Sequence, residues 1–336
     1  MQQRIYLDYQ ASTPVDPRVL EAMTPYFQLR PGNPHSSEHS FGWEAAEAVE
    51  FAASQVAGGL GVDPDEIVFT SGATEANNLA IVGAVCRASD KRRRIIVSAI
   101  EHKSVLATVD AVARRYGCEI DALPVDSEGR VVLDELEARL SDDVLLVSVM
   151  AVNNEIGSVQ PIDTIAALAH EVGALVHTDG AQALTCSAFD CAVLDVDFAS
   201  LSGHKVYGPK GVGALYVKRS QRGRLEPQLY GGGQQGGLRS GTLPVPLIVG
   251  FGRAIELLQG ENADTERKRV RELRNAFVAR LRELVPGAQV NGPDEIRRHP
   301  GNANIRFREV EGDVLVGNMQ PTIGASTGSA CNAGEH

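Results

Sequence analysis

Short apolar runs alternate with longer helix-like segments over most of the chain, and this alternation restricts the folds that the chain can adopt. The three clearest pairs are residues 67–70 with 75–86, residues 95–99 with 105–116, and residues 144–149 with 162–171. Further apolar runs lie at residues 174–178, 198–200 and 212–217. Strands that alternate with helices in this way form a mostly parallel sheet with helices on both faces. The pattern predicts an α/β fold, in which ligands bind beyond the carboxyl ends of the strands.

The segment before this alternation has a helical pattern of its own. Residues 16–29 place Val19, Leu20, Met23 and Phe27 on one face of an expected helix. This face is expected to pack against the core.

The character of the sequence changes near residue 260. A long charged helix is expected over residues 264–284, and strand-like pieces follow between 290 and 307. A short strand at residues 6–8 can join either part of the molecule. Because 336 residues exceed what one ordinary core accommodates, we predict two domains. The large domain covers residues 14–260, and a smaller α+β domain covers residues 1–13 and 261–336.

Charge and hydropathy exclude several classes of protein. The formal net charge of −11 argues against direct binding of nucleic acid, which needs a positive field to neutralise phosphates. The longest apolar run, residues 144–152, is far shorter than the roughly 20 residues of a membrane-spanning helix. The first four residues are not followed by an apolar segment, so we expect neither a secretory signal nor a membrane anchor.

The five cysteines are odd in number, which with the missing signal predicts free thiols and a cytoplasmic location. Four of them, Cys86, Cys118, Cys186 and Cys191, are interpreted as small packed hydrophobic residues. Their spacing does not form a metal-binding motif, and no metal is expected. Cys331 stands apart because it lies in a segment rich in Ser and Gly.

Polar side chains follow several of the predicted strands. Ser71-Gly72-Ala73-Thr74-Glu75 opens a helix, and small residues at a helix N-terminus expose backbone N–H groups that bind anions. The alternative for this segment is a plain helix cap. It lacks the lysine of a nucleotide-binding P-loop. The segment is therefore a candidate phosphate site rather than a nucleoside triphosphate site.

The later strands are followed by residues that suit acid–base and covalent chemistry. His102 and Asn154 each follow a predicted strand, and Asp179 with Gln182 follows another. Lys205 comes after the run at residues 198–200, where a partly desolvated lysine can act as a Schiff-base amine. The alternative for any single lysine is an exposed loop. A phosphate site, an Asp for a pyridinium nitrogen, a His and a Lys together indicate pyridoxal 5'-phosphate (PLP).

On these residues the sequence resembles the cysteine desulfurases, a branch of the class V aminotransferases with the PLP-transferase fold of type I. The resemblance runs from Tyr6-Leu7-Asp8 to Cys331. Its motifs are Gly32-Asn33-Pro34, Thr70-Ser71-Gly72-Ala73-Thr74-Glu75, Glu101-His102-Lys103, Asn153-Asn154-Glu155 with Gly157, His177 with Asp179 and Gln182, Ser202-Gly203-His204-Lys205, Arg239-Ser240-Gly241-Thr242 and Ser329-Ala330-Cys331.

The resemblance implies a role for each site residue. Lys205 would bind PLP covalently, and His102 would stack on its ring and assist proton transfer. Asp179 would pair with the ring nitrogen, while Gln182 and Asn154 would lie near the phenolic oxygen, with Asn154 also near the substrate carboxylate. The phosphate would be held by Ala73, Thr74, Ser202 and His204, and by Thr242 of the other subunit of a homodimer.

The activity implied by the resemblance is the conversion of L-cysteine to L-alanine. Lys205 would take the Cα proton of cysteine, and the Cys331 thiolate would attack the substrate sulfur and keep it as a persulfide. The acceptor of that sulfur would be a protein of iron–sulfur cluster assembly, tRNA thiolation or DNA phosphorothioation.

The sequence departs from the family at its end. It stops at His336, five residues after Cys331, and no residue can be assigned as the Arg that pairs with the substrate carboxylate in the family. We therefore expect the sequence to be part of a longer protein, with the small domain incomplete. The alternatives are a selenocysteine lyase or another class V PLP enzyme, and a truncated, non-catalytic dimerisation partner. Intact Lys205 and Asp179 argue against the last of these.

Overall fold

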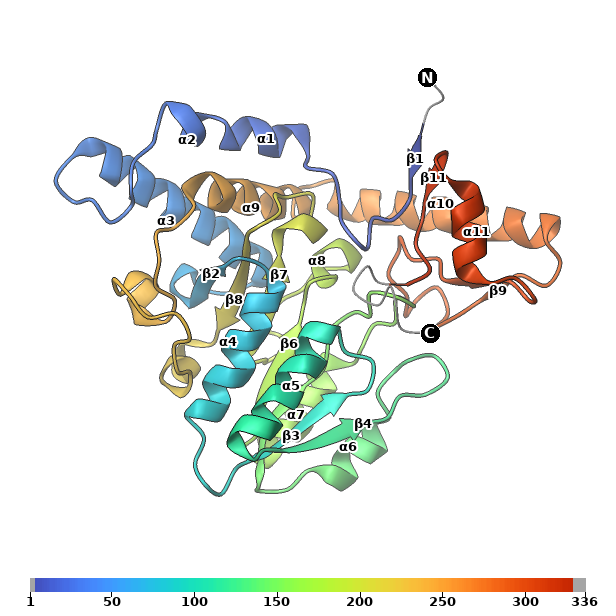
Figure 1. Ribbon diagram of the computed structural model, residues 1–336, viewed down its shortest axis with the longest axis horizontal. Coiled ribbons are helices and arrows are strands. Elements are labelled where there is room, and N and C mark those ends of the chain that lie inside the picture. Colours follow the sequence, from blue (N-terminus) through green and yellow to red (C-terminus); the bar gives the residue numbers. More distant parts are fainter. Residues whose placement is uncertain (1–3, 329–336) are drawn as a thin grey trace.

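A seven-stranded sheet forms the centre of the computed structural model, which describes residues 4–328 (Figure 1). Its strand order is β2-β8-β7-β6-β5-β3-β4. The strands are β2 Ile67–Thr70, β3 Arg94–Ser98, β4 Glu119–Leu123, β5 Val144–Ser148, β6 Leu175–Asp179, β7 Phe198–Ser202 and β8 Gly213–Val217. All neighbours pair in parallel except β8, which is antiparallel to both β2 and β7. The predicted mostly parallel α/β fold is confirmed.

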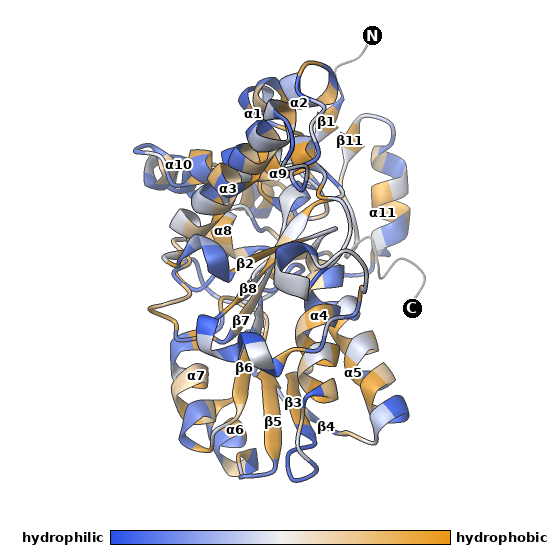
Figure 2. Cartoon of the chain, turned by 90° about the vertical axis from the view of Figure 1, so that its left-hand side faces the viewer, coloured by the Kyte–Doolittle hydropathy of each residue, from blue (hydrophilic) through white to orange (hydrophobic). Residues whose placement is uncertain are grey.

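Helices cover both faces of this sheet, as Figure 2 shows, with α4 and α5 on one side and α6 and α7 on the other. One hydrophobic core lies beneath α4 Ala73–Cys86 and α5 Lys103–Tyr116. A second, larger core is formed with α3 Ser40–Leu60, α6 Leu133–Arg139, α7 Ile162–Glu171 and α9 Val245–Leu258. Strands β5 and β6 are buried along their whole length, which is why they read as continuous apolar runs in the sequence.

The remaining elements are short or lie at the edges. They are α1 Pro17–Met23, α2 Pro25–Gln28, α8 Ala183–Cys186, α10 Ala263–Leu284, α11 Gly312–Met319, and the 3₁₀ turns η1 Pro64–Glu66, η2 Gly203–Lys205, η3 Arg219–Arg224 and η4 Gln234–Gly237. Within residues 4–328, no helix is long and apolar enough to cross a membrane.

Two small sheets complete the structure at the side of the molecule where α10 and α11 lie (Figure 1). Strand β1 Ile5–Tyr6 pairs in parallel with β11 Ile323–Gly324, and β9 Gln289–Val290 pairs with β10 Ile305–Arg306. The N-terminal strand therefore joins the C-terminal part of the chain. The domain boundaries given above stay a prediction.

The helix expected over residues 16–29 is broken in two, which corrects the sequence interpretation. Pro25 starts α2, because proline has no N–H to continue the hydrogen bonding of α1. Val19 and Met23 are buried, whereas Leu20 and Phe27 are 55% and 58% exposed. Both α1 and α2 still contact α9.

One of the four cysteines interpreted as packed is exposed. Cys118, Cys186 and Cys191 are buried, and burial raises the pKa of Cys186 to about 11. Cys86 is exposed, because it is the last residue of α4, where the helix leaves the sheet.

A histidine between two carboxylates ties α7 to the sheet. His170 Nε2 lies 3.0 Å from Asp197 Oδ2, and its Nδ1 lies 3.2 Å from Asp195 Oδ2. The hydrogen bond to Asp197, with the charges of both carboxylates, raises the pKa of His170 against the effect of burial. A raised pKa in the folded state means that this stabilisation is full below the unfolded pKa of about 6.5. It is lost as the pH rises through the folded pKa.

We predict that His170→Ala lowers the free energy of unfolding by about 1 kcal/mol more at pH 6 than at pH 9. Urea unfolding at the two pH values measures this difference. His35→Ala is the control, because His35 is exposed and its side chain makes none of the ion pairs found in the described part of the chain. An equal loss at both pH values for His170→Ala would contradict the prediction.

Candidate active site

A cavity of about 3060 Å³ lies between the carboxyl ends of the sheet strands and the part of the chain that includes α10 and α11. Nine of the residues selected from the sequence line it: Ala73, Thr74, His102, Asn154, Asp179, Gln182, Ser202, His204 and Lys205. The volume exceeds the 300–1,000 Å³ that is typical of a small-molecule pocket. The site residues therefore occupy one part of a wider opening.

The two other selected residues stand differently. Thr242 is exposed and does not line this cavity. Cys331 lies outside the described residues. Ser326, Thr327 and Gly328, which precede it in the sequence, do line the cavity.

The start of α4 provides the candidate phosphate site. Its N-cap residue is Gly72, which has no side chain to cap the helix, and the first N–H groups of a helix have no acceptor within it. The preceding N–H of Ser71 donates to Glu75 Oε2 over 2.7 Å, and Arg239 Nε donates to Glu75 Oε1 over 2.7 Å. Among the residues that the structure describes, no side chain caps the start of α4, so the alternative interpretation of this segment as a plain helix cap is wrong. The N–H groups of the first turn remain for an anion.

The first turn of α4 lies very close to strand β8. A Cβ atom on Gly213 would lie 2.3 Å from Leu201 O and 2.7 Å from Gly72 Cα. On the other side, Ser202 Oγ is 3.7 Å from the position of a Cβ on Gly72. Only glycine at position 213 lets the start of α4 approach the sheet this closely.

Asp179 is the last residue of β6 and is 4% exposed. Its Oδ1 accepts a hydrogen bond from the backbone N of Ala181 over 3.0 Å, and its Oδ2 accepts one from Asn77 Nδ2 over 2.8 Å. Both of these donors are neutral. A buried carboxylate held in this way suits a cationic partner such as a protonated ring nitrogen.

His102 caps the N-terminus of α5, which determines the position of its ring. Its Nδ1 accepts from the backbone N of Ser104 over 3.1 Å and lies 2.8 Å from Ser104 Oγ. Burial lowers the pKa of His102, the charge of Lys205 lowers it further, and Asp179 and Glu155 oppose the change. The imidazole is therefore neutral at pH 7.

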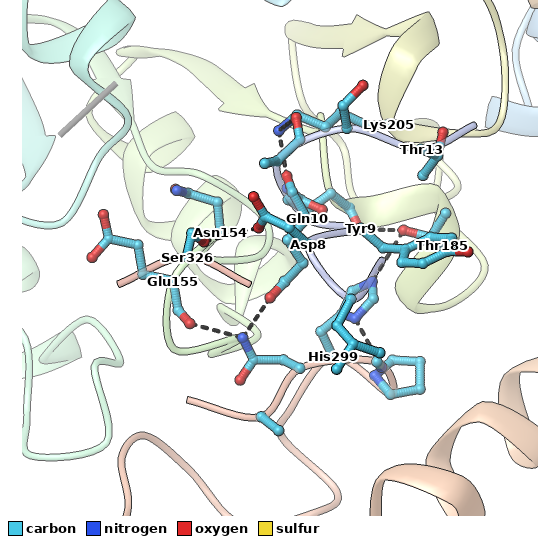
Figure 3. A pocket seen from close by; sticks show the side chains of 18 of the residues that line it. Asp8, Tyr9, Gln10, Thr13, Asn154, Glu155, Thr185, Lys205, His299 and Ser326 are labelled. Atoms are coloured by element: carbon cyan, nitrogen blue, oxygen red, sulfur yellow. Dashed lines mark hydrogen bonds between the residues drawn. The ribbon is translucent and has the colours of Figure 1, made fainter. Parts of the chain in front are cut away.

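Lys205 ends η2, directly after β7, and its side chain reaches the N-terminal segment that crosses the cavity (Figure 3). Its Nζ donates to the carbonyl oxygens of Gln10 and Ala11. Gln182 Nε2 donates to the same Gln10 oxygen over 2.9 Å. Two of the selected residues thus meet at one backbone carbonyl.

His204 faces the same segment and lines the cavity beside Lys205. Its Nδ1 lies 3.3 Å from Ser12 Oγ, and its carbonyl oxygen accepts from Thr13 N and Thr13 Oγ1. Burial lowers the pKa of His204 to about 4, with the charges of Lys205 and Lys210 acting in the same direction. It is therefore a neutral hydrogen-bonding group and not a cation.

The C-terminal part of the chain closes the site from the opposite side. Asn302 Nδ2 donates to Gln10 Oε1 over 2.6 Å and to Glu155 O over 2.8 Å. Ser326 Oγ donates to Asp8 Oδ1 over 2.9 Å, beside the segment drawn in Figure 3. These contacts join residues from three distant parts of the sequence around Lys205.

Sequence reasoning missed several residues that hold the site together, among them Asn77, Ser104 and Gln10. Asn77 stands among apolar residues of α4, and a polar residue on such a helix is a signal for a buried hydrogen bond. Ser104 follows His102 by two residues, a spacing typical of a helix cap. Gln10 acts mainly through its backbone carbonyl, which no residue type reveals.

Comparison with known proteins identifies the family. A model of the family described as Aminotransferase class-V matches residues 5–335. The cysteine desulfurase IscS of Rickettsia rickettsii (strain Iowa) is 46% identical over 329 residues, which cover 98% of this chain and 79% of that protein. The chain belongs to the cysteine desulfurase family. Members of this family, within the class V aminotransferases, depend on PLP.

Solved structures of this family share the fold at high similarity. A NifS-like protein superposes with a TM-score of 0.92 at 38% identity, covering 96% of this chain and 87% of that one. The structure of SspA in complex with cysteine gives a TM-score of 0.84 at 37% identity, covering 98% and 90%. The fold of cysteine desulfurases is thus present over nearly the whole chain.

We predict that Gly213→Ala destabilises the protein by about 1–3 kcal/mol, because the added methyl group overlaps the backbone of Leu201 and Gly72. Displacing Gly72 also weakens anion binding at the start of α4. Thermal unfolding and titration with inorganic phosphate measure the two effects. Gly223→Ala is the matched control, since a Cβ there meets nothing within 4 Å. Equal behaviour of the two variants would show that the close approach is unimportant.

Proposed function

We propose that the protein transfers sulfur from L-cysteine to Cys331 and uses PLP bound in this cavity. The observation that carries the proposal is the gathering of Asp179, His102 and Lys205 around one cavity, next to the open N-terminus of α4. The relationship to IscS, and the cysteine bound in the SspA structure, support the choice of substrate.

The residues present fit the cofactor. Ala73 and Thr74 begin the uncapped α4, Ser202 Oγ lies near Gly72, and His204 lines the same cavity; these four residues would hold the phosphate. Asp179, buried between neutral donors, would accept from the protonated ring nitrogen. The positions assigned to His102, Asn154 and Gln182 beside the ring are part of the same proposal. When bound, PLP supplies an electron sink for the substrate Cα.

Lys205 would be the covalent attachment point of the cofactor, and its freed amine would then be the base for the Cα proton of cysteine. Its Nζ lies against the carbonyls of Gln10 and Ala11, and these acceptors orient the amine within the cavity. Asn302 donates to Gln10 Oε1 on the other side and is held in turn by the backbone carbonyl of Glu155, so the segment that orients Lys205 is itself fixed.

Cys331 completes the reaction as the sulfur acceptor. Its thiolate attacks the sulfur of the substrate, the carbon–sulfur bond breaks, and its electron pair stays on carbon, which is protonated to give alanine. The sulfur remains on Cys331 as a persulfide. Iron–sulfur scaffolds, tRNA-thiolation proteins and DNA-phosphorothioation proteins remain the candidate acceptors, and the cytoplasm the expected location.

Two variants separate these roles. Lys205→Ala is expected to lose the borohydride-reducible attachment of PLP, whereas Cys331→Ser keeps the attachment and its colour. Cys331→Ser is expected to lose release of sulfide in the presence of a reductant. Cys118→Ser is the control for a thiol outside the site. A covalent adduct in Lys205→Ala, or normal turnover in Cys331→Ser, would contradict the proposal.

The functional unit in this proposal is a homodimer. Five large apolar side chains in and next to α2 and α3 are between 52% and 76% exposed, and they are Phe27, Leu29, Phe41, Trp43 and Phe51. Such exposure is typical of a protein interface. Figure 1 shows α2 and α3 at the opposite end of the molecule from α10 and α11, so this surface is separate from the small sheets. Thr242, which is exposed and away from its own cavity, would reach the phosphate site of the partner.

Mixing two inactive chains tests this arrangement. Lys205→Ala and Thr242→Trp are each expected to be inactive. In an equimolar mixture half of the dimers are mixed, and each mixed dimer is expected to have half of wild-type turnover, so the mixture recovers up to about one quarter. The recovery arises because one of the two sites of a mixed dimer combines an intact Lys205 with an intact partner Thr242. Sedimentation of the wild type gives the oligomeric state. A fully active monomer would overturn the proposal.

A further inference from the structure

Asn77 is a buried amide for which the proposed function gives no role. It lies on α4, and its side chain is 0% exposed. Its Nδ2 donates one hydrogen bond to Asp179 Oδ2 over 2.8 Å and a second to Ser104 Oγ over 2.9 Å. Ser104 Oγ in turn lies 2.8 Å from His102 Nδ1. The contacts join Asp179 to His102 through two intervening side chains.

The two ends of this network determine the direction of every hydrogen bond in it. The Asp179 carboxylate can only accept, so the NH₂ group of Asn77 faces it. The second hydrogen of that NH₂ group goes to Ser104 Oγ, and the Ser104 hydroxyl keeps its own hydrogen for His102 Nδ1. Independently, the backbone N–H of Ser104 donates to the same Nδ1 over 3.1 Å. Two donors converge on Nδ1, so the proton of the ring is on Nε2.

We propose that Asn77 is a positioning residue of this active site. Its one amide group orients the Asp179 carboxylate and, through Ser104, holds His102 as the Nε2–H tautomer. The inference rests on the proposed function, because it assigns the network to the site where PLP and cysteine bind. It goes beyond that function in giving Asn77 and Ser104 a role and in defining which nitrogen of His102 carries the proton.

Burial and charge around His102 agree with this arrangement. Burial lowers the pKa of His102, Lys205 acts in the same direction, and Asp179 and Glu155 act against it. The ring is therefore neutral and carries a single N–H proton, on either Nδ1 or Nε2. Because Nδ1 is occupied by two donors, His102 offers an N–H to a group in the cavity. In this state it acts as a hydrogen-bond donor through Nε2, while Nδ1 is occupied as an acceptor.

The other atom of the Asn77 amide shows that the residue is not there for packing alone. Among the described residues, Asn77 Oδ1 is buried without a hydrogen-bond partner. A buried carbonyl oxygen without a partner destabilises the fold, and an apolar side chain of similar size would avoid this penalty. The NH₂ group of Asn77 donates both of its hydrogens to residues of the site, and this explains why an amide occupies this position.

Ring nitrogen NMR of protein labelled with ¹⁵N-histidine tests the tautomer directly. The chain has eight histidines, and the spectrum of His102→Gln identifies the signals of His102. In the wild type, His102 is expected to show a protonated Nε2 and an unprotonated, hydrogen-bonded Nδ1. This measurement needs neither substrate nor turnover. If the wild-type protein has no desulfurase activity, the proposed function is wrong, but the NMR result for the His102 tautomer does not change.

Two matched pairs of variants test the network. Asn77→Leu removes both donors, and its control Asn78→Leu makes the same change at the next residue of α4, whose side chain donates only to Thr74 O. Ser104→Ala removes the hydroxyl, and Ser104→Thr restores it. Asn77→Leu and Ser104→Ala are expected to shift the Nδ1 signal of His102, whereas both controls leave it in place.

Kinetics of the PLP-loaded enzyme supply the second readout. For Asn77→Leu and Ser104→Ala we expect kcat to fall about 10- to 100-fold, the scale for outer residues that orient a reacting group, with KM for cysteine little changed. Asn77→Leu alone is also expected to alter the absorption spectrum of bound PLP, since it frees Asp179.

A wild-type His102 protonated on Nδ1 would overturn the inference. The same conclusion follows if Asn77→Leu matches Asn78→Leu in both the NMR signal and kcat. Should Asn77→Leu fail to fold, the Ser104→Ala and Ser104→Thr pair decides by itself, because identical behaviour of those two variants would rule out the hydroxyl link.

Discussion

Parallel hydrogen bonding of β3, β5, β6 and β7 is the constraint on which the whole site depends. Because these strands run in one direction, their carboxyl ends meet at the same edge of the sheet, and the residues that follow them are brought together. His102, Asp179 and Lys205 belong to three different strand ends of this kind. The paired register of Asp179 with Ser200 places the carboxylate one strand away from the turn that carries Lys205. Any change in the order of the strands would separate these groups.

Polar groups at this buried edge are costly, and the structure satisfies most of them with neutral partners. His177, which is 0% exposed, lies between Ser148 Oγ and Ser200 Oγ, and burial lowers its pKa to about 4. Burial also raises the pKa of Glu101 well above its usual range, and its Oε1 accepts from Met150 N. For both side chains, burial favours the neutral form. The hydrogen bonds from Asn77 and Ala181 hold the Asp179 carboxylate at this edge.

The N-terminal segment adds a second level of organisation. Its carbonyl groups hold Lys205 and Gln182, while Gln10 Oε1 is held by Asn302. The segment also continues into β1, which pairs with β11 near the end of the described chain. The position of Lys205 thus depends on contacts with both ends of the sequence, and a change far from the sheet can alter the site.

Local patterns determined most of the architecture but less of the site. Periodicity predicted β2 and α7 at their observed bounds, because continuous burial or an amphipathic face leaves a strong signal. It missed β4, whose residues are mostly half-buried or exposed and so form no apolar run. It also missed α9, in which apolar residues predominate along the helix and a proline stands at the start. Nine of the residues that line the cavity were predicted, mainly because polar residue types directly follow strands, a feature that the sequence displays by itself.

Only the tertiary structure decided how those residues act on one another. The sequence alone determined that an Asp, a His and a Lys stand at strand ends, since residue type and strand position are local properties. It did not show that Asn77 joins Asp179 to Ser104, or that carbonyls of the N-terminal segment hold Lys205. Asn77 is separated from Ser104 by 27 positions and from Asp179 by 102, and Lys205 is held by a backbone oxygen of a kind that every residue possesses. Hydrogen bonds of this kind are determined by the packing of helices and loops over the sheet, so they follow from the fold and not from any local pattern.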